Sequence, residues 1–211
     1  MIKVLIADDH AVVRSGLKQI LDETEGEIRV EGEAVNGREV LEKIQARDWD
    51  VLVLDITMPG RSGLDILKDI RQLKPGLPVL ILSMHAEEQF ATRMLKAGAS
   101  GYLNKESAPE ELVKAIRKVY SGGKYVSATQ AERMVSELTG DSDKRPHEIL
   151  SDREYEILCL IASGKTATQI AKELVLSVKT VSTYRSRILE KMNLSTNAQL
   201  THYAIKNGLV N

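Results

Sequence analysis

The chain has 211 residues, of which 43% are hydrophobic and 28% charged, and its formal net charge at pH 7 is −1. This length allows two small domains, and the composition is that of an ordinary soluble protein. The single cysteine, Cys159 in "EILCLIAS", excludes an internal disulfide and is expected to be a small buried residue. No apolar run approaches the roughly 20 residues of a membrane helix, and "MIKVLIADDH" lacks the segments of a signal peptide. We therefore expect a cytoplasmic protein with no membrane partner.

Strand-like and helix-like segments alternate through the first 120 residues. Short apolar runs predict strands over 2–7, 28–35, 50–55, 78–83 and 101–104. Helical periodicity predicts helices over 11–23, 37–47, 63–74, 87–97 and 108–120. This repeated alternation predicts an α/β fold, a doubly wound five-stranded parallel sheet with helices on both faces.

The pattern changes after residue 120. A short helix is predicted over 128–138, and the polar stretch "TGDSDKRPHEI" at 139–149 is interpreted as an interdomain linker, because it has little to bury. Further on, helical periodicity predicts a small all-α domain with helices over 152–163, 167–174, 178–191 and 196–207. We predict a first domain over 1–121, a linker with a short helix over 122–149, and a helical domain over 150–211.

Capping residues support the helices of the second domain. Ser151, Thr166 and Ser177 are each predicted N-caps. Glu154 lies three residues after Ser151 and completes a capping box, and Gly164 suits the end of the first of these helices.

Charge is divided unevenly between the two predicted domains. Residues 151–211 carry eight Lys or Arg and five Asp or Glu, a net charge of +3, whereas the first 150 residues carry −4. Such asymmetry is a weak indication of an acidic domain joined to a nucleic-acid-binding domain.

Carboxylates follow two of the predicted strands. Asp8 and Asp9 come after the first strand, and in "VLVLDITMPGRSG" a run of four aliphatic residues ends at Asp55. Because parallel neighbours end at the same edge of a sheet, the three carboxylates are expected to converge. Such a cluster needs a cation or raised pKa values, and hard oxygen ligands favour Mg²⁺. The alternative is that these acids only cap solvated strand ends.

Polar groups also follow the fourth and fifth predicted strands, Ser83 in "LILSMH" and Lys105 in "GYLNKE". A hydroxyl and an ammonium at the edge that carries the carboxylates suit phosphoryl transfer, which depends on positioning and charge neutralisation. A carboxylate can be the nucleophile, and Asp55 is the best candidate because it stands alone at its strand end. The metal and Lys105 could neutralise the phosphoryl group, and Ser83 could hydrogen-bond its oxygen.

The motifs "VLIADDH", "VLVLDITMPGRSGLD", "VLILSMH" and "GYLNK" occur in this order and together resemble the receiver domain of two-component response regulators, over residues 1–120. The resemblance implies a flavodoxin-like receiver fold in which Asp55 accepts a phosphoryl group from a sensor histidine kinase. It also implies that Mg²⁺ is held by Asp8, Asp9, Asp55 and the backbone carbonyl of Thr57.

The same resemblance implies a switch. Ser83 and Lys105 would sense the phosphoryl group, and Tyr102 would swing inward when Ser83 moves, although a tyrosine on a short strand is often only a packing residue. Two residues depart from the usual receiver pattern. Glu106 stands where many receivers have proline, so a cis peptide bond after Lys105 is less expected. Met84 stands where a small residue is common, and it can cover part of the pocket and slow phosphate exchange.

Two of the predicted helices, 167–174 and 178–191, are joined by a short turn through Leu176 and match helix-turn-helix geometry. A buried stripe on the second helix is predicted from Val181, Tyr184, Ile188 and Leu189. The opposite face carries cations and small hydroxyls, namely Lys179, Thr180, Ser182, Thr183, Arg185, Ser186 and Arg187. Long cations can reach phosphates while short hydroxyls fit against base edges in the major groove. A lone helix with such a face is more often simply solvated.

Residues 150–194, "LSDREYEILCLIASGKTATQIAKELVLSVKTVSTYRSRILEKMNL", resemble the LuxR-type helix-turn-helix of NarL/FixJ response regulators, and the closing "AQLTHYAIKNGLV" is similar to that of the GacA/UvrY group. The resemblance implies that Ser182, Thr183 and Ser186 face the bases of double-stranded promoter DNA. It implies backbone contacts from Lys165, Thr166, Lys179, Arg185 and Arg187. The last helix would pair two copies into a homodimer.

Three hypotheses follow. The leading one is a DNA-binding transcription regulator, not an enzyme, in which phosphorylation of Asp55 shifts domain packing and favours dimerisation at an inverted repeat. The second is an aspartyl-phosphate phosphohydrolase of the haloacid-dehalogenase type. Such enzymes usually need a second Asp where this chain has Thr57, and no general base is evident although His85 is near. The third is a regulator that ignores phosphate and responds to protein contacts or a ligand.

Overall fold

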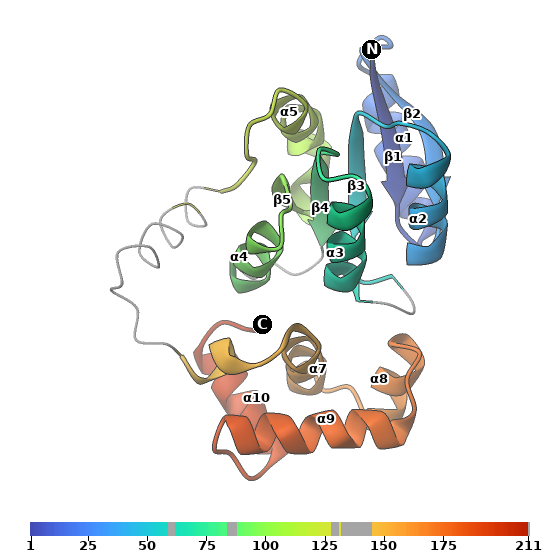
Figure 1. Ribbon diagram of the computed structural model, residues 1–211. Helices are drawn as coiled ribbons and strands as arrows, with labels where there is room; N and C mark the ends of the chain where they lie inside the picture. The colour runs from blue at the N-terminus through green and yellow to red at the C-terminus, as the bar shows by residue number, and fades with distance from the viewer. Residues whose placement is uncertain (59–61, 84–87, 128–130, 132–144, 211) are drawn as a thin grey trace. The chain divides into compact units, whose positions relative to one another are not determined.

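A computed structural model of the protein describes residues 1–58, 62–83, 88–127, 131 and 145–210 (Figure 1). The chain divides into two compact units, Met1–Gln130 and Ala131–Asn211. The first unit is an α/β domain, and the described part of the second is helical. Within the described residues, no helix has the combination of length and apolar character that crossing a membrane requires.

The first unit is built on a five-stranded sheet with the strand order β2-β1-β3-β4-β5. Its strands are β1 (Ile2–Ala7), β2 (Ile28–Ala34), β3 (Val51–Asp55), β4 (Val79–Ser83) and β5 (Gly101–Asn104). All neighbouring strands are parallel. Strands β3 and β4 are buried along their whole length, because helices cover both faces, and this explains their aliphatic sequences. The predicted doubly wound α/β fold is confirmed.

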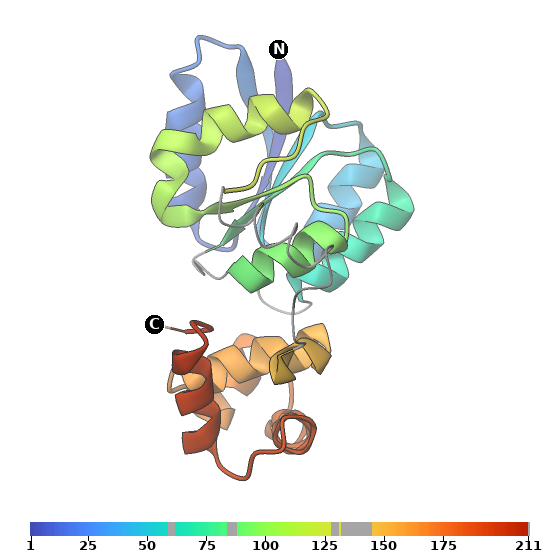
Figure 2. The same ribbon diagram turned by 90° about the vertical axis from the view of Figure 1, so that its left-hand side faces the viewer.

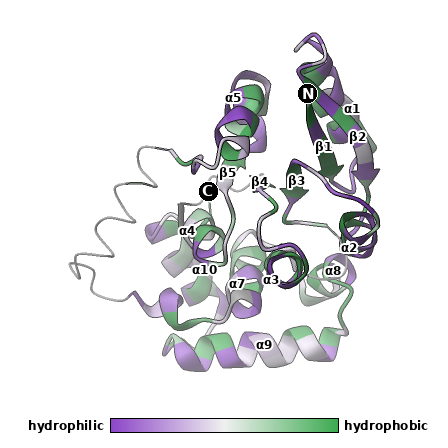
Figure 3. Cartoon of the chain, turned by 45° about the horizontal axis from the view of Figure 1, so that its top comes forward, coloured by the Kyte–Doolittle hydropathy of each residue, from purple (hydrophilic) through white to green (hydrophobic). Residues whose placement is uncertain are grey.

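Helices cover the sheet on both faces (Figures 1 and 2). On one face lie α1 (Ala11–Asp22) and α5 (Ala108–Tyr120), and on the other lie α2 (Gly37–Ala46), α3 (Gly63–Leu73) and α4 (Glu88–Lys96). One buried cluster joins Val4 of β1 and Val53 of β3 to Ile116 of α5. Figure 3 shows the hydrophobic character of β1 and β3 that this burial requires. Within the described residues, each predicted strand or helix forms with its ends no more than one residue away from the predicted ones.

A short extended segment after α5 adds to the edge of the sheet. Tyr125 forms an isolated parallel bridge with Gly101. The amide of Tyr102 donates to the carbonyl of Tyr125, and the amide of Tyr125 donates to that of Ser100, both at 3.0 Å. Glycine is needed at position 101, because a Cβ there would lie 2.8 Å from the Cβ of Tyr125. The contacts of the first unit therefore continue past the predicted boundary at residue 121.

The second unit contains four helices in its described residues, α7 (Asp152–Ala162), α8 (Ala167–Glu173), α9 (Val178–Lys191) and α10 (Asn197–Lys206). Helix α7 packs against α9 and α10, and α8 packs against α9. Tyr155 and Leu158 of α7, Ile170 of α8 and Ile188 of α9 are fully buried between them. Cys159 is buried, as predicted.

The predicted caps of these helices are confirmed. The side chains of Ser151, Thr166 and Ser177 each accept a hydrogen bond from the amide three residues later. Ser151 and Glu154 form the predicted capping box. Gly164 follows the end of α7 with a φ of +83°, a conformation that glycine adopts without strain.

The predicted linker ends in a structured turn. The helix expected over 128–138, apart from Ala131, and residues 139–144 lie outside the described residues. The 3-10 turn η2 (Pro146–Ile149) precedes α7, and within it His147 is fully buried. The Nδ1 atom of His147 lies 2.7 Å from the hydroxyl oxygen of Tyr203 in α10. The tyrosine hydroxyl gives the buried imidazole a hydrogen-bonding partner. This part of the polar stretch therefore belongs to the packed second unit.

Candidate metal centre and nucleic-acid interface

Acidic side chains gather at the carboxyl edge of the sheet. Strands β1 and β3 pair in parallel register up to their carboxyl ends, so Asp8 and Asp55 are neighbours there. One ligand atom from each of Asp8, Asp9, His10 and Asp55 lies within 4.8 Å of the others. The side chains of Asp8 and Asp55 are 1% and 0% exposed, whereas that of Asp9 is 28% exposed. The convergence expected from parallel neighbours is present.

Lys105 bridges two of these acids. It lies just beyond β5, in the 3-10 turn η1 (Lys105–Ser107). Its Nζ is 2.7 Å from Oδ2 of Asp8 and 2.8 Å from Oδ2 of Asp55, and the lysine side chain is only 8% exposed. Oδ1 of Asp55 accepts hydrogen bonds from the amide of Thr57 at 3.0 Å and from its hydroxyl at 2.8 Å. Donors on two sides therefore fix the orientation of the Asp55 carboxylate.

The pKa of Lys105 is raised above its ordinary value. Burial by itself lowers the pKa of an amine, but the hydrogen bonds and negative charges of Asp55 and Asp8 outweigh that effect. The lysine is therefore an ammonium at neutral pH and supplies positive charge to the cluster. No cis peptide bond occurs among the described residues, so the bond between Lys105 and Glu106 is trans.

The cluster suits a small divalent cation. Oδ2 of Asp8 and Oδ1 of Asp9 are buried and form no hydrogen bond within the described residues, although Lys105 lies at ion-pair distance from the first. Carboxylates gathered this closely need positive charge beyond that of one lysine, and oxygen ligands are those that Mg²⁺ prefers. His10, which the sequence patterns did not indicate as a ligand, has its Nδ1 3.0 Å from Oδ1 of Asp9. Its place directly after Asp9 was the available signal.

The other predicted pocket residues lie on neighbouring strands or loops. Ser83 ends β4, the partner of β3, and is fully buried. Tyr102 in β5 is 3% exposed, so its ring is inside the domain. The movement of Tyr102 and the metal contact of the Thr57 carbonyl stay predictions. Met84 and His85 lie outside the described residues.

Close packing of the backbone positions the loop after β3. A Cβ on Gly63 would lie 2.5 Å from the Cα of Ile56, the residue next to Asp55. The hydroxyl of Ser62 caps α3 by accepting a hydrogen bond from the amide of Leu64 at 3.2 Å. Only glycine lets the first turn of α3 approach the end of β3 this closely.

Helices α8 and α9 form the predicted helix-turn-helix. Helix α8 ends at Glu173, and α9 begins at Val178 after a short turn. Val181, Ile188 and Leu189 are buried, which confirms most of the predicted stripe. Figure 3 shows hydrophobic and hydrophilic patches alternating along α9, as expected of a helix with one buried face.

The residues predicted to contact DNA divide into two groups. Those on the outer side of α9 are exposed, namely Lys179, Ser182, Thr183, Ser186 and Arg187, except that Thr180 is half-buried. The others are engaged within the domain: Lys165 pairs with Glu173 at 2.6 Å, and Nε of Arg185 donates to Oδ1 of Asn197 at 2.5 Å. Thr166 is the N-cap of α8. These three side chains therefore have structural partners that a DNA contact would have to share or replace.

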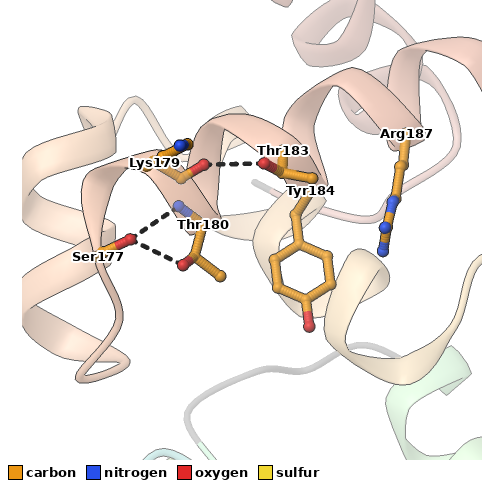
Figure 4. Close-up of a pocket in the computed structure, with 6 residues that line it drawn as sticks. All are labelled: Ser177, Lys179, Thr180, Thr183, Tyr184 and Arg187. Atoms are coloured by element: carbon orange, nitrogen blue, oxygen red, sulfur yellow. Dashed lines mark hydrogen bonds between the residues drawn. The ribbon is translucent and has the colours of Figure 1, made fainter.

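A pocket on α9 includes two residues that are not among the predicted DNA contacts. It has a volume of about 320 Å³ and is lined by Ser177, Lys179, Thr180, Thr183, Tyr184 and Arg187 (Figure 4). Ser177 was selected only as a cap, and Tyr184 was assigned to the buried stripe. Tyr184 is only half-buried, because it lies at the margin of that stripe. Its spacing from Thr180 and Arg187, on one side of the helix, was the signal for a surface role.

Comparison with known protein families covers both units. Residues 4–117 match the response regulator receiver domain. Residues 148–204 match the bacterial regulatory proteins of the luxR family. The acidic cluster thus lies in the first matching segment, and the helix-turn-helix lies in the second.

Individual relatives match along nearly their whole lengths. Response regulator UvrY of Escherichia coli O6:H1 is 39% identical over 212 residues, which cover 100% of this chain and 97% of UvrY. Response regulator GacA of Pseudomonas protegens is 38% identical over 210 residues, which cover 100% and 98% of the two chains. RcsB from Salmonella enterica serovar Typhimurium, solved bound to promoter P1flhDC in the presence of phosphomimetic BeF3−, is 28% identical, with a TM-score of 0.68 and coverage of 96% and 97%.

Proposed function

Because this chain belongs to the NarL/FixJ family of two-component response regulators, whose members join a receiver domain to a LuxR-type DNA-binding domain, we propose that its phosphorylation-dependent control of transcription operates through Asp55. A sensor histidine kinase is the phosphoryl donor in this proposal. The observation that carries it is the buried set of contacts from Lys105 to Asp8 and Asp55, at 2.7 and 2.8 Å. Such a charged cluster at the carboxyl edge of a parallel sheet lies where α/β folds place their ligands.

The transfer is a displacement at phosphorus. An oxygen of Asp55 attacks the phosphorus of the phosphohistidine, a new P–O bond forms as the P–N bond breaks, and the imidazole nitrogen keeps the electron pair. The product is an acyl phosphate on Asp55. Thr57 holds one oxygen of Asp55 through two hydrogen bonds, which orients the carboxylate before the reaction. Lys105 already contacts the other oxygen, so its charge is close to where the phosphoryl group arrives.

The acidic cluster is the proposed Mg²⁺ site. Asp8, Asp9, Asp55 and the backbone carbonyl of Thr57 would hold the ion, which supplies charge neutralisation for phosphoryl oxygens when bound. The convergence of ligand atoms from Asp8, Asp9 and Asp55 within 4.8 Å supports this proposal. Ser83 and Lys105 would contact the phosphoryl group, and the ring of Tyr102 would swing inward when Ser83 moves.

The output is DNA binding by a homodimer. Phosphorylation favours a receiver conformation that dimerises, and α10 pairs the two DNA-binding domains. The outer side of α9 enters the major groove, where Ser182, Thr183 and Ser186 face bases. A two-fold dimer fits an inverted repeat, because protein symmetry and site symmetry then agree. The RcsB structure, bound to promoter DNA in the presence of a phosphomimetic, supports DNA binding by the phosphorylated state.

The phosphoacceptor is tested by labelling the full chain with radiolabelled acetyl phosphate and Mg²⁺. The unaltered protein should take up label that is stable to acid and lost in base, as expected of an acyl phosphate. Asp55→Asn should remove the label. Asp22→Asn, at an exposed position in α1, is the matched control and should label like the unaltered protein. Equal labelling of the Asp55 variant and the control would refute the assignment.

A further inference from the structure

Arg14 connects the acidic edge of the sheet to a neighbouring strand. It lies in the first turn of α1, which packs on β2 (Figure 1), and its side chain is only 13% exposed. Its Nη1 donates a hydrogen bond to the backbone carbonyl of Asp8 at 2.8 Å. Its Nε donates to Oε2 of Glu33 in β2 at 2.9 Å. One guanidinium therefore joins α1, β2 and the loop that carries Asp8 and Asp9.

The Asp8 carbonyl belongs to the peptide group between two of the candidate metal ligands. A peptide group is planar, so a hydrogen bond that holds this carbonyl also sets the direction in which the chain continues to Asp9. The described strand pairing ends at Ala7, one residue before this peptide. The amide of Asp8 still donates to the carbonyl of Ala34 at 3.1 Å. The sheet thus holds the amide of Asp8, and Arg14 holds its carbonyl.

Helix α1 gives this loop little support through its own amino-terminal end. Its N-cap, His10, makes no side-chain capping hydrogen bond, and its first turn contains no acidic residue. The amide of His10 instead donates to Oδ1 of Asp8 at 2.8 Å. Any movement of the loop would therefore change the surroundings of the Asp8 carboxylate. Arg14 opposes such movement, because it holds the backbone of the loop from outside.

Glu33 fixes the guanidinium in turn. Its Oε1 accepts a hydrogen bond from Nζ of Lys18 at 2.9 Å, while its Oε2 accepts the one from Arg14. These two hydrogen bonds hold the pKa of Glu33 below its ordinary value, so the residue is a carboxylate at neutral pH. Its negative charge offsets that of Arg14, which reduces the repulsion between the guanidinium and a cation at the acidic edge.

We propose that Arg14 is a positioning residue for Mg²⁺ binding, because its hold on the Asp8–Asp9 peptide keeps both carboxylates ready for one ion. It thereby sets the Mg²⁺ concentration at which Asp55 is phosphorylated. The inference rests on the proposed function, because it requires the acidic cluster to bind Mg²⁺. The planar fork of an arginine reaches two acceptors at once, whereas a lysine ammonium is a point charge. The role also differs from that of Lys105, which contacts the carboxylates themselves.

The first test measures the Mg²⁺ affinity of the unphosphorylated full chain by calorimetric titration. Arg14→Lys keeps the charge and can keep the ion pair with Glu33, but it loses the fork that reaches the Asp8 carbonyl. The dissociation constant for Mg²⁺ should rise about tenfold, the lower end of the loss seen when groups that orient metal ligands are removed. Arg38→Lys is the matched control, because Arg38 pairs with Glu42 at 2.7 Å within α2. It should bind Mg²⁺ like the unaltered protein.

The rate of phosphorylation by acetyl phosphate separates positioning from chemistry. In Arg14→Lys, the Mg²⁺ concentration that gives half of the maximal rate should rise about tenfold, in step with the dissociation constant. The maximal rate should return close to that of the unaltered protein, because a bound ion itself holds both carboxylates. A lower maximal rate with an unchanged Mg²⁺ requirement would overturn the inference.

The outcomes separate this inference from the proposed function. If the unaltered chain binds no Mg²⁺ and takes no label from acetyl phosphate, the proposed function fails and the inference fails with it. If the unaltered chain does both and Arg14→Lys has the same Mg²⁺ affinity, the inference alone is overturned. Urea unfolding without Mg²⁺ shows whether each variant is folded during the titration. A weaker affinity that disappears when sucrose restores full folding would also overturn the inference, since the loss would then come from unfolding.

Discussion

Lys105 is the residue whose removal most directly perturbs the acidic cluster. In Lys105→Met the side-chain length is kept and the charge is lost, so the carboxylates of Asp8 and Asp55, both essentially unexposed, lose an ammonium at 2.7 and 2.8 Å. At an effective dielectric constant of about 20, each contact carries roughly 6 kcal/mol of Coulomb attraction, part of which offsets the cost of burying the charges. Removing one partner of a buried ion pair costs about 3–5 kcal/mol in measured cases. We expect the free energy of unfolding of the first unit to fall by about 3–5 kcal/mol in Lys105→Met.

The assay is urea unfolding of the full chain at pH 7 without divalent cations, followed by the fluorescence of Trp49. This is the only tryptophan in the sequence, and it lies in the receiver unit, so it reports that domain. Saturating Mg²⁺ should restore part of the stability of the variant, because the ion replaces the missing positive charge. Lys114→Met, at an exposed lysine on α5, controls for loss of a surface charge. Equal midpoints for the two variants would show that Lys105 does not stabilise the acidic cluster.

The raised pKa of Lys105 fixes the sign of the pH dependence. Because the pKa is higher in the folded state, the contribution of Lys105 to stability is fully present below its ordinary value of 10.5. It is lost as the pH rises through the folded-state pKa. The difference in unfolding free energy between the unaltered protein and Lys105→Met should therefore be constant around neutral pH and shrink in strong alkali.

Three further predictions concern other parts of the chain. Asp9→Asn should weaken the Mg²⁺-dependent rise in the Trp49 unfolding midpoint, measured by titrating Mg²⁺, and an identical rise would exclude Asp9 as a ligand. Gly63→Ala should cost about 2 kcal/mol or more, because its Cβ would meet backbone at 2.5 Å, and an unchanged urea midpoint would contradict that contact. Glu154→Gln should destabilise the helical domain above the ordinary pKa of 4.5 but not at lower pH. Burial raises the pKa of Glu154, but hydrogen bonds from Lys191 and Ser151 outweigh burial and lower the pKa, so the stabilisation by Glu154 is lost as the pH falls. Hydrogen exchange of α7 in the two proteins measures the difference in stability, and a difference that does not change with pH would contradict the prediction.

The sheet and the acidic cluster were predictable because both depend on local signals. A buried parallel strand is almost wholly aliphatic, so a carboxylate directly after four aliphatic residues indicates that the strand ends at Asp55. Parallel pairing then brings the strand ends together, which places Asp8 and Asp55 at one edge. The contacts of Thr57 were not predictable, because its amide and hydroxyl reach Asp55 through a local loop conformation that leaves no periodic sequence pattern.

Three other features escaped the sequence patterns for physical reasons. The bridge between Tyr125 and Gly101 consists of backbone hydrogen bonds, which leave no side-chain periodicity. His147 is buried by a partner 56 residues away, Tyr203, so a polar stretch was interpreted as exposed. Tyr184 looked like a core residue because aromatic residues at helical spacing usually are, whereas its position at the edge of the buried stripe leaves it on the surface of a pocket.

In the proposed function, phosphoryl loading of the acidic cluster changes how the chain binds DNA. Affinity for a duplex selected from random DNA should be measured with and without acetyl phosphate in the presence of Mg²⁺, with sedimentation of the same samples. We expect binding about 100-fold tighter after phosphorylation, a population shift of a few kcal/mol, together with a change from monomer to dimer. Asp55→Asn should show neither effect. Unchanged affinity and sedimentation in protein shown to carry the phosphoryl group would contradict the proposed function.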